Sequence, residues 1–107
     1  MSNTLLPLGS SIGILGGGQL GRMIAMSCIE LGYKSFVYCP KGANPAVEVS
    51  SQNIIGDWNN DLLLNKFISS VDAVTIEFEN IPIEVIHNIE KKLLFYPNSK
   101  VLSSSQY

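Results

Sequence analysis

Apolar residues along this chain follow two alternating patterns. One is the short, continuous apolar run, rich in β-branched residues, that is typical of a buried strand. The other repeats an apolar residue every three or four positions, as on one face of an amphipathic helix. The strand-like runs cover residues 11–15, 34–39, 53–56, 71–78 and 94–96, and the helix-like segments cover residues 20–31, 60–69 and 82–93.

Strands that alternate with helices predict an α/β fold with a mostly parallel sheet of four to five strands and helices on both faces. This is a Rossmann-like, three-layer arrangement. Gly32 follows the first helical segment where a C-terminal glycine belongs, and Asn60 precedes the second as an N-cap. Pro82 stands near the first position of the third. Residues 40–51, rich in Pro, Gly, Asn and Ser, predict a loop.

The helical stripes also predict which side chains face the sheet. In the second helix these are Leu63, Leu64, Phe67 and Ile68, and in the third they are Ile83, Ile86, Ile89 and Leu93. His87, between two of the latter, is interpreted as a surface residue.

The chain length of 107 residues indicates one small domain. Residues 1–10 are polar and irregular, with a proline and a glycine, and we expect a flexible leader there. Residues 11–107 then form the domain itself.

Composition excludes several classes of protein. Hydrophobic residues make up 46% of the chain and charged residues 15%, which excludes a disordered chain. Seven basic and nine acidic residues give a net charge of −2 with no basic patch, so no nucleic-acid partner is expected. The first basic residue is Arg22 and no long apolar run precedes it, which argues against a signal peptide or a membrane span. Cys28 and Cys39 fit no metal-binding spacing and are interpreted as reduced, structural thiols of a cytoplasmic protein.

A glycine-rich turn joins the first strand to the first helix. Gly16, Gly18 and Gly21 satisfy the spacing G-x-G-x-x-G in the strand-to-helix context that the motif requires. The first glycine allows a tight turn, the second lets a phosphate or sugar approach the backbone, and the third lets the helix pack close to the strand. Free N–H groups and the helix dipole favour an anion at this turn. The structural alternative is a tight turn that binds nothing.

Dinucleotide binding, the usual function of this motif, is disfavoured by the second strand. A NAD site needs Asp or Glu at the end of that strand to hold the ribose hydroxyls. Here the strand ends in Cys39, and Pro40 and Lys41 follow. We therefore expect no NAD binding. Lys41 could accept the 2′-phosphate of NADP, but one lysine alone does not favour NADP binding.

A second group of candidate residues follows the fourth strand, at the edge where ligands bind in open α/β sheets. Glu77 and Glu79 are two positions apart, so in a strand they point to the same side. Near the glycine turn, either carboxylate could accept hydrogen bonds from an amine or a sugar hydroxyl. The alternatives are that both are solvated, or that Glu79 only supports a helix cap at Asn80. Arg22 is a further candidate, for a phosphate or for a surface contact.

Two motifs together resemble a known family. The sequence GGGQLGRM at residues 16–23 and EFENIP at residues 77–82, with LGY at 31–33 and YCP at 38–40, closely resembles the N-terminal domain of the 5-(carboxyamino)imidazole ribonucleotide synthetases. The similarity runs across nearly all of residues 11–107. Either motif alone would not be specific, but the pair is.

The resemblance implies a pre-ATP-grasp domain of an ATP-grasp ligase. Such an enzyme uses ATP and bicarbonate to carboxylate the exocyclic amine of 5-aminoimidazole ribonucleotide in purine biosynthesis, through carboxyphosphate. Magnesium neutralises the nucleotide phosphates. The resemblance further implies a homodimer, and it assigns substrate contacts to the glycine turn and to the end of the fourth strand. Those residues are Gly17, Gly18, Gln19, Leu20 and Glu77, with Glu79 and Arg22 as further candidates.

The same resemblance places ATP and Mg²⁺ mainly outside this chain. The family continues into regions that bind ATP and metal, and the arginine of its usual QDR-like segment would fall just beyond Tyr107. We therefore expect no catalytic residue within the chain and no catalysis by the chain alone.

Two other functions stay open. One is a different ATP-grasp ribonucleotide enzyme, of the formate-dependent glycinamide ribonucleotide transformylase type. The other is a non-enzymatic Rossmann module that senses a nucleotide, although the acidic residue that such modules need after the second strand is absent.

Overall fold

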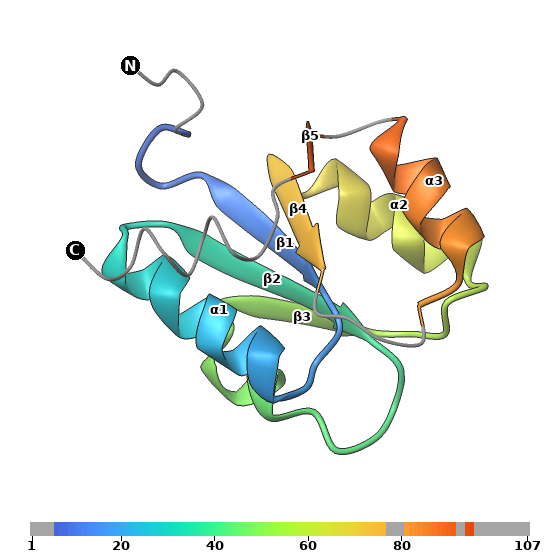
Figure 1. Ribbon diagram of the computed structural model, residues 1–107, viewed down its shortest axis with the longest axis horizontal. Helices are drawn as coiled ribbons and strands as arrows, with labels where there is room; N and C mark the ends of the chain where they lie inside the picture. The colour runs from blue at the N-terminus through green and yellow to red at the C-terminus, as the bar shows by residue number, and fades with distance from the viewer. Residues whose placement is uncertain (1–5, 77–80, 92–93, 96–107) are drawn as a thin grey trace.

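The fold is organised around one sheet of five parallel strands (Figure 1). The computed structural model describes residues 6–76, 81–91 and 94–95. The spatial order of the strands is β3-β2-β1-β4-β5, so β1 lies in the centre and pairs with both β2 and β4. The strands are β1 (Ser11–Leu15), β2 (Lys34–Cys39), β3 (Gln52–Ile55), β4 (Ala73–Ile76) and β5 (Leu94–Phe95).

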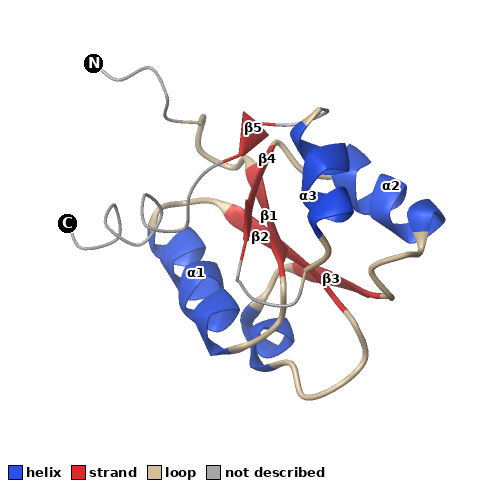
Figure 2. Ribbon diagram, turned by 45° about the vertical axis from the view of Figure 1, so that its right-hand side comes forward, coloured by secondary structure: helices blue, strands red, loops and turns tan. Residues whose placement is uncertain are grey.

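Helices cover both faces of this sheet (Figure 2). On one face lie α1 (Gln19–Glu30) and a short 3₁₀ helix, η1 (Pro45–Val49). On the other lie α2 (Asp61–Ser69) and α3 (Ile83–Glu90). The expected Rossmann-like three-layer fold with a parallel sheet is confirmed, because all four strand pairings are parallel.

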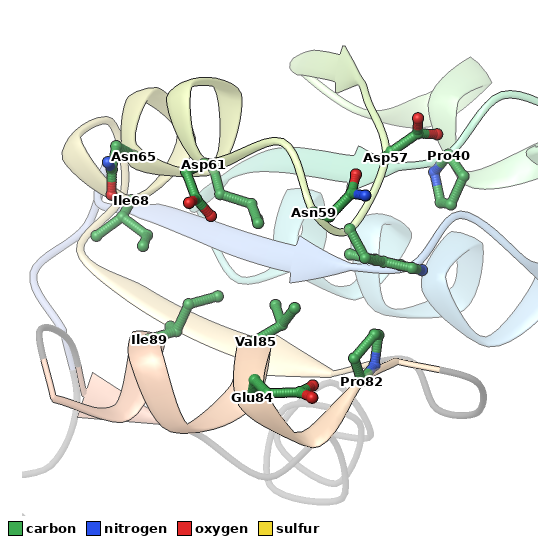
Figure 3. Close-up of a pocket in the computed structure, with 12 residues that line it drawn as sticks. Pro40, Asp57, Asn59, Asp61, Asn65, Ile68, Pro82, Glu84, Val85 and Ile89 are labelled. Atoms are coloured by element: carbon green, nitrogen blue, oxygen red, sulfur yellow. The ribbon is translucent and has the colours of Figure 1, made fainter.

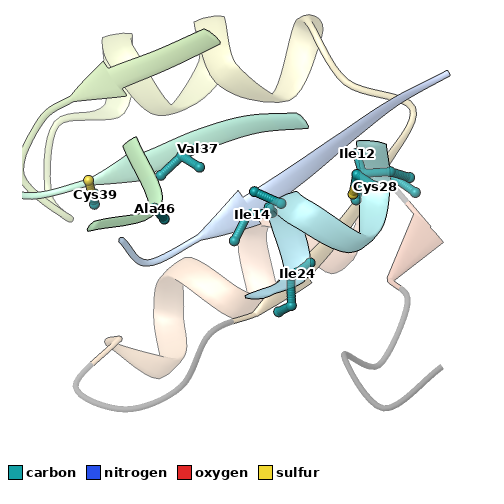
Figure 4. Packing of buried hydrophobic residues seen from close by; sticks show 9 residues of the cluster. Ile12, Ile14, Ile24, Cys28, Val37, Cys39 and Ala46 are labelled. Carbon is teal, nitrogen blue, oxygen red and sulfur yellow. The ribbon is translucent and has the colours of Figure 1, made fainter. Parts of the chain in front are cut away.

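The layer beneath α1 is a core of small and branched side chains (Figure 4). Ile12 and Ile14 of β1 point towards Ile24 and Cys28 of α1, as alternate strand residues share one face. Burial raises the pKa of the Cys28 thiol to about 12, so this side chain stays protonated and packs as a small apolar group. Cys28 and Cys39 are both buried.

The opposite layer is built around the ring of Phe67. This α2 residue is fully buried and meets the Phe36 ring edge to face, with centroids 5.5 Å apart. The centroid of the Tyr38 ring lies 5.6 Å from the centroid of the Phe67 ring. Gly13 on β1 leaves the space for the Phe67 ring, since a Cβ there would lie 2.6 Å from its Cζ atom.

Most predicted elements are confirmed, with small shifts at their ends. β1 and β2 have the predicted bounds, and β3 begins one residue earlier than expected. Asn60 caps α2, because its side chain accepts a hydrogen bond from the Leu63 N–H at 3.0 Å. β4 begins at Ala73 rather than at residue 71, and Glu77 and Phe78 lie outside the described residues.

Two predictions were wrong in part. The segment predicted as a loop at residues 40–51 contains η1, which begins at a proline, a residue suited to a helix start. The predicted inner face of α3 is confirmed at Ile89, which is buried, but was wrong at Ile83, which is 64% exposed, and it omitted Val85, which is buried. Val85 and Ile89 are one helical turn apart and face the sheet, and Ile83 precedes Val85 by over half a turn.

Pro82 is the N-cap of α3 rather than its first residue, and His87 is exposed, as expected.

Residues 6–10 contact the turn between α1 and β2. The Gly9 N–H donates to the Gly32 carbonyl at 2.8 Å, and the Tyr33 hydroxyl donates to the Leu6 carbonyl at 2.9 Å. Leu6 also packs against the core beneath α1. The rest of the expected leader, residues 1–5, lies outside the described residues.

We expect Gly13→Ala to lower the free energy of unfolding by about 1–3 kcal/mol, a typical cost of overpacking a core. The Phe67 ring cannot move aside, because Phe36 and Tyr38 pack against it. Urea unfolding measures the change. The cost of Gly13→Ala should shrink in a Phe67→Leu background, and an equal cost in both backgrounds would contradict the proposed contact.

Candidate functional site

The glycine turn leaves the carboxyl end of β1 in a conformation that favours glycine. Gly16 has φ +113°, which side chains rarely adopt, and it is buried. Its N–H donates to the Tyr38 carbonyl of β2 at 2.8 Å. This bond holds the start of the turn to the neighbouring strand, so the turn lies at the carboxyl edge of the sheet.

The next residue of the turn is held by the segment that follows β2. The Gly17 carbonyl accepts a hydrogen bond from the Ala46 N–H of η1 at 2.9 Å. A Cβ on Gly17 would lie 2.6 Å from Asn44 Oδ1 and 2.8 Å from Cys39 Sγ. The Asn44 side chain in turn donates to the Pro40 carbonyl at 2.9 Å. Gly17 is therefore required for close packing against residues 39–46.

This support for the turn was not predicted from the sequence. Asn44 and Ala46 lie in the segment that was predicted only as a loop. The available signal was Asn44 directly before Pro45, since Asn often bonds to nearby backbone and Pro often begins a helix. The contact with Gly17 joins residues far apart in the sequence, so local rules could not show it.

The first turn of α1 offers backbone N–H groups at the same edge. Gly18 is the N-cap and makes no side-chain cap, and the first turn contains no acidic residue. Gln19 is exposed, and Leu20 is half-buried against the core beneath α1. The positive end of the helix dipole is thus not neutralised by a carboxylate of its own first turn, which suits an anion such as a phosphate.

The strand order places the end of β4 beside this turn. The register pairs Leu15 of β1 with Ile76 of β4, the residues directly before the glycine turn and before Glu77. The chain leaves β1 towards β2 on one side and returns as β4 on the other, so the two segments flank a topological switch point. Glu77 and Glu79 themselves lie outside the described residues.

Two buried polar atoms lie on the elements that flank this switch point. Within the described part of the chain, the Nε atom of Arg22 and the Oγ1 atom of Thr75 make no hydrogen bond. Thr75 is fully buried on β4 and pairs with Ile14, whereas Arg22 is half-buried in the first turns of α1. Unpaired buried polar atoms are uncommon in proteins and call for an explanation. Thr75 was not among the sequence-based candidates, because a threonine in a strand looks like ordinary strand composition.

The described residues show no metal centre and no membrane-spanning helix. No group of three or more His, Cys, Asp or Glu residues is placed to hold a metal ion among residues 6–76, 81–91 and 94–95. No helix there has the length and apolar character needed to cross a bilayer.

A family model described as the ribonucleotide synthetase preATP-grasp domain matches residues 10–106. The chain is 42% identical over 105 residues to the bifunctional purine synthesis protein purC/E of Dictyostelium discoideum, covering 98% of this chain and 10% of that protein. It is 36% identical over 106 residues to the N5-carboxyaminoimidazole ribonucleotide synthase of Brucella melitensis, covering 99% of this chain and 29% of that enzyme.

A solved structure shows the same architecture. The Staphylococcus aureus N5-carboxyaminoimidazole synthetase complexed with ADP superimposes with a TM-score of 0.79 and 33% identity, over 91% of this chain and 26% of that one. The chain thus spans less than a third of the length of each of these proteins.

We expect Gly17→Ala to destabilise the fold by about 1–3 kcal/mol and to displace the first turn of α1, because the new methyl group overlaps the Asn44 side chain. Thermal unfolding and the amide chemical shifts of residues 18–22 measure the two effects. Asn44→Gly in the same chain removes the nearest overlapping atoms and should restore part of both. Wild-type stability and unchanged shifts in Gly17→Ala would show that the turn does not need this glycine.

Proposed function

Since the chain belongs to the family of ribonucleotide synthetase preATP-grasp domains, we propose that it is the substrate-binding N-terminal domain of an ATP-dependent carbon–nitrogen ligase. The proposed reaction is the carboxylation of 5-aminoimidazole ribonucleotide in purine biosynthesis. The names of the relatives support this choice. The observation that carries it is the glycine turn, whose helix N-terminus is free of acidic residues and lies beside the carboxyl end of β4.

In the proposed reaction, bicarbonate first attacks the γ-phosphorus of ATP, and ADP leaves. This step forms carboxyphosphate. The exocyclic amine of the ribonucleotide then attacks the carbonyl carbon of carboxyphosphate, phosphate leaves, and the amine loses a proton. The products are 5-carboxyaminoimidazole ribonucleotide, ADP and phosphate. The role of this domain is to hold the ribonucleotide so that its amine is oriented for that attack.

We assign the ribonucleotide contacts to the two segments at the switch point. The backbone at Gly17 and Gly18 and the first residues of α1, Gln19 and Leu20, would contact the ribonucleotide. Exposed Gln19 has an amide that can donate and accept hydrogen bonds. Glu77, directly after β4, would accept hydrogen bonds from the amine or the ribose hydroxyls. Glu79 and Arg22 are further candidates at this site.

We propose that ATP and Mg²⁺ bind mainly to other regions of the ligase. Among the described residues, no group of three or more His, Cys, Asp or Glu is placed to hold a metal ion. The Brucella relative is more than three times as long as the matched region, and the similar Staphylococcus structure is a complex with ADP. β2 ends at Cys39 without a carboxylate, which disfavours NAD as a ligand.

The remaining assignments are also proposals. We propose that residues 11–107 form the domain, that the whole enzyme is a homodimer in the cytoplasm, and that the chain alone is inactive. Sedimentation of the whole enzyme tests the dimer.

Calorimetry with 5-aminoimidazole ribonucleotide tests the assigned residues. We expect Glu77→Gln to weaken binding by about tenfold or more, because a hydrogen bond to a charged group contributes about 1.5–3 kcal/mol. Gln19→Ala should weaken binding less, since a neutral hydrogen bond contributes about 0.5–1.5 kcal/mol. Glu48→Gln removes an exposed carboxylate from η1 and serves as the matched control with unchanged affinity.

Binding of NADH without binding of the ribonucleotide would contradict the proposal. So would a Glu77→Gln variant that binds the ribonucleotide like the wild type. ATP added to the chain alone should produce no ADP.

A further inference from the structure

A large hollow lies on the face of the sheet away from the glycine turn's helix (Figure 3). Its volume is about 850 Å³, which is within the usual range of ligand pockets. It runs between α2 and α3 and reaches the carboxyl edge of the sheet at Pro40, Asp57 and Pro82. Neither the glycine turn nor the first turn of α1 lines it.

Both apolar and acidic residues line this groove. Ile68 of α2 and Ile89 of α3 face each other across one end (Figure 3). Asp57, Asp61 and Glu84 also line the groove; Asp57 lies beside Pro40 at the sheet edge, and Asp61 lies nearer Ile68 (Figure 3). The described lining residues include no lysine or arginine. The groove therefore combines apolar side chains with three carboxylates, and no basic side chain lines it among the described residues.

The side of the groove formed by Asp57 and Trp58 is held in place by Tyr38 of β2. The Tyr38 hydroxyl donates to the Asp57 carbonyl at 2.6 Å, and the Trp58 ring packs 5.6 Å from the Tyr38 ring. Burial, with a smaller effect of the Asp57 charge, raises the pKa of Tyr38 above its usual value, so its hydroxyl remains a donor. Asn60, shortly after Trp58 in the chain, caps the start of α2. These contacts fix the wall of the groove that Asp57 and Trp58 form.

Of the three carboxylates, Asp57 is the least compensated. Asp61 and Glu84 lie in the first turns of α2 and α3, where the helix dipole offsets part of their charge. Asp57 lies in the loop after β3, and it is exposed. A cationic group at the mouth of the groove would therefore be attracted most strongly by Asp57.

We propose that this groove is a docking site for an apolar segment carrying lysine or arginine, contributed by the part of the ligase outside this domain. The carboxylates of the groove would attract the lysine or arginine of this segment, and the facing isoleucines would contact its apolar side chains. The source rests on the proposed function, because relatives such as the Brucella enzyme have about 70% of their length outside the match. The ribonucleotide binds elsewhere, at the glycine turn.

Trp58 reports on this groove directly, because it lines the groove and is the only tryptophan of the chain. The probe is a synthetic helical peptide that has leucines along one face and arginines on either side of them. A control peptide has glutamates in place of the arginines. We expect only the arginine peptide to change Trp58 emission. Asp57→Lys should weaken its binding by about two- to fivefold, the effect of one exposed ion pair, and should improve binding of the glutamate peptide. Added salt should weaken the arginine peptide's binding.

The matched control is Glu30→Lys, which makes the same charge change at an exposed position at the end of α1, on the opposite face. It should leave both titrations unchanged. No emission change with either peptide would overturn the proposal, as would equal binding of both peptides.

Two further outcomes would contradict the proposal by indicating a different ligand for the groove. Full competition by benzylammonium would indicate a small-molecule site, and an emission change with protein concentration alone would indicate a second copy of this chain. The titrations contain no ribonucleotide. If the chain binds the ribonucleotide normally but does not bind the peptide, only the docking site is contradicted. If it binds the peptide but not the ribonucleotide, only the proposed function is contradicted.

Discussion

The structure depends on the parallel pairing of β1 with β2 on one side and with β4 on the other. This pairing creates the switch point, because the chain must leave the end of β1 in one direction and return in the other. Hydrogen bonds from the Gly16 N–H to Tyr38 and from the Ala46 N–H to Gly17 then fix the turn against β2 and η1. The first N–H groups of α1 are positioned by these bonds rather than by a capping side chain.

Tyr38 connects this turn to the other side of the sheet. Its carbonyl accepts from Gly16, and its hydroxyl donates to Asp57 beside the groove. Its ring packs between Phe67 and Trp58. One residue of β2 therefore supports both the proposed ribonucleotide site and the proposed docking site, which keeps the two in a fixed relation along one edge of the sheet.

Local sequence rules predicted the strands, the Asn60 cap and the glycine turn, because each depends on residues close together in the chain. They failed where tertiary contacts decide. Ile89 was predicted to face the sheet, but packing also buries Val85 and leaves Ile83 exposed, and η1 is held to Gly17 by a long-range hydrogen bond. The groove between α2 and α3 and the unpaired Thr75 hydroxyl also needed three-dimensional structure. Ligand contacts at Glu77 rest on the family motif, since that residue lies outside the described residues.

The central claim is that the glycine turn binds a ribonucleotide through the backbone at the start of α1. Amide chemical shifts of the isotope-labelled chain, followed during titration with 5-aminoimidazole ribonucleotide, test it most directly. We expect the largest shifts at Gly17, Gly18, Gln19 and Leu20, with small shifts in α2 and α3. Shifts confined to the groove between α2 and α3, or no shifts in the turn at saturating ribonucleotide, would contradict it.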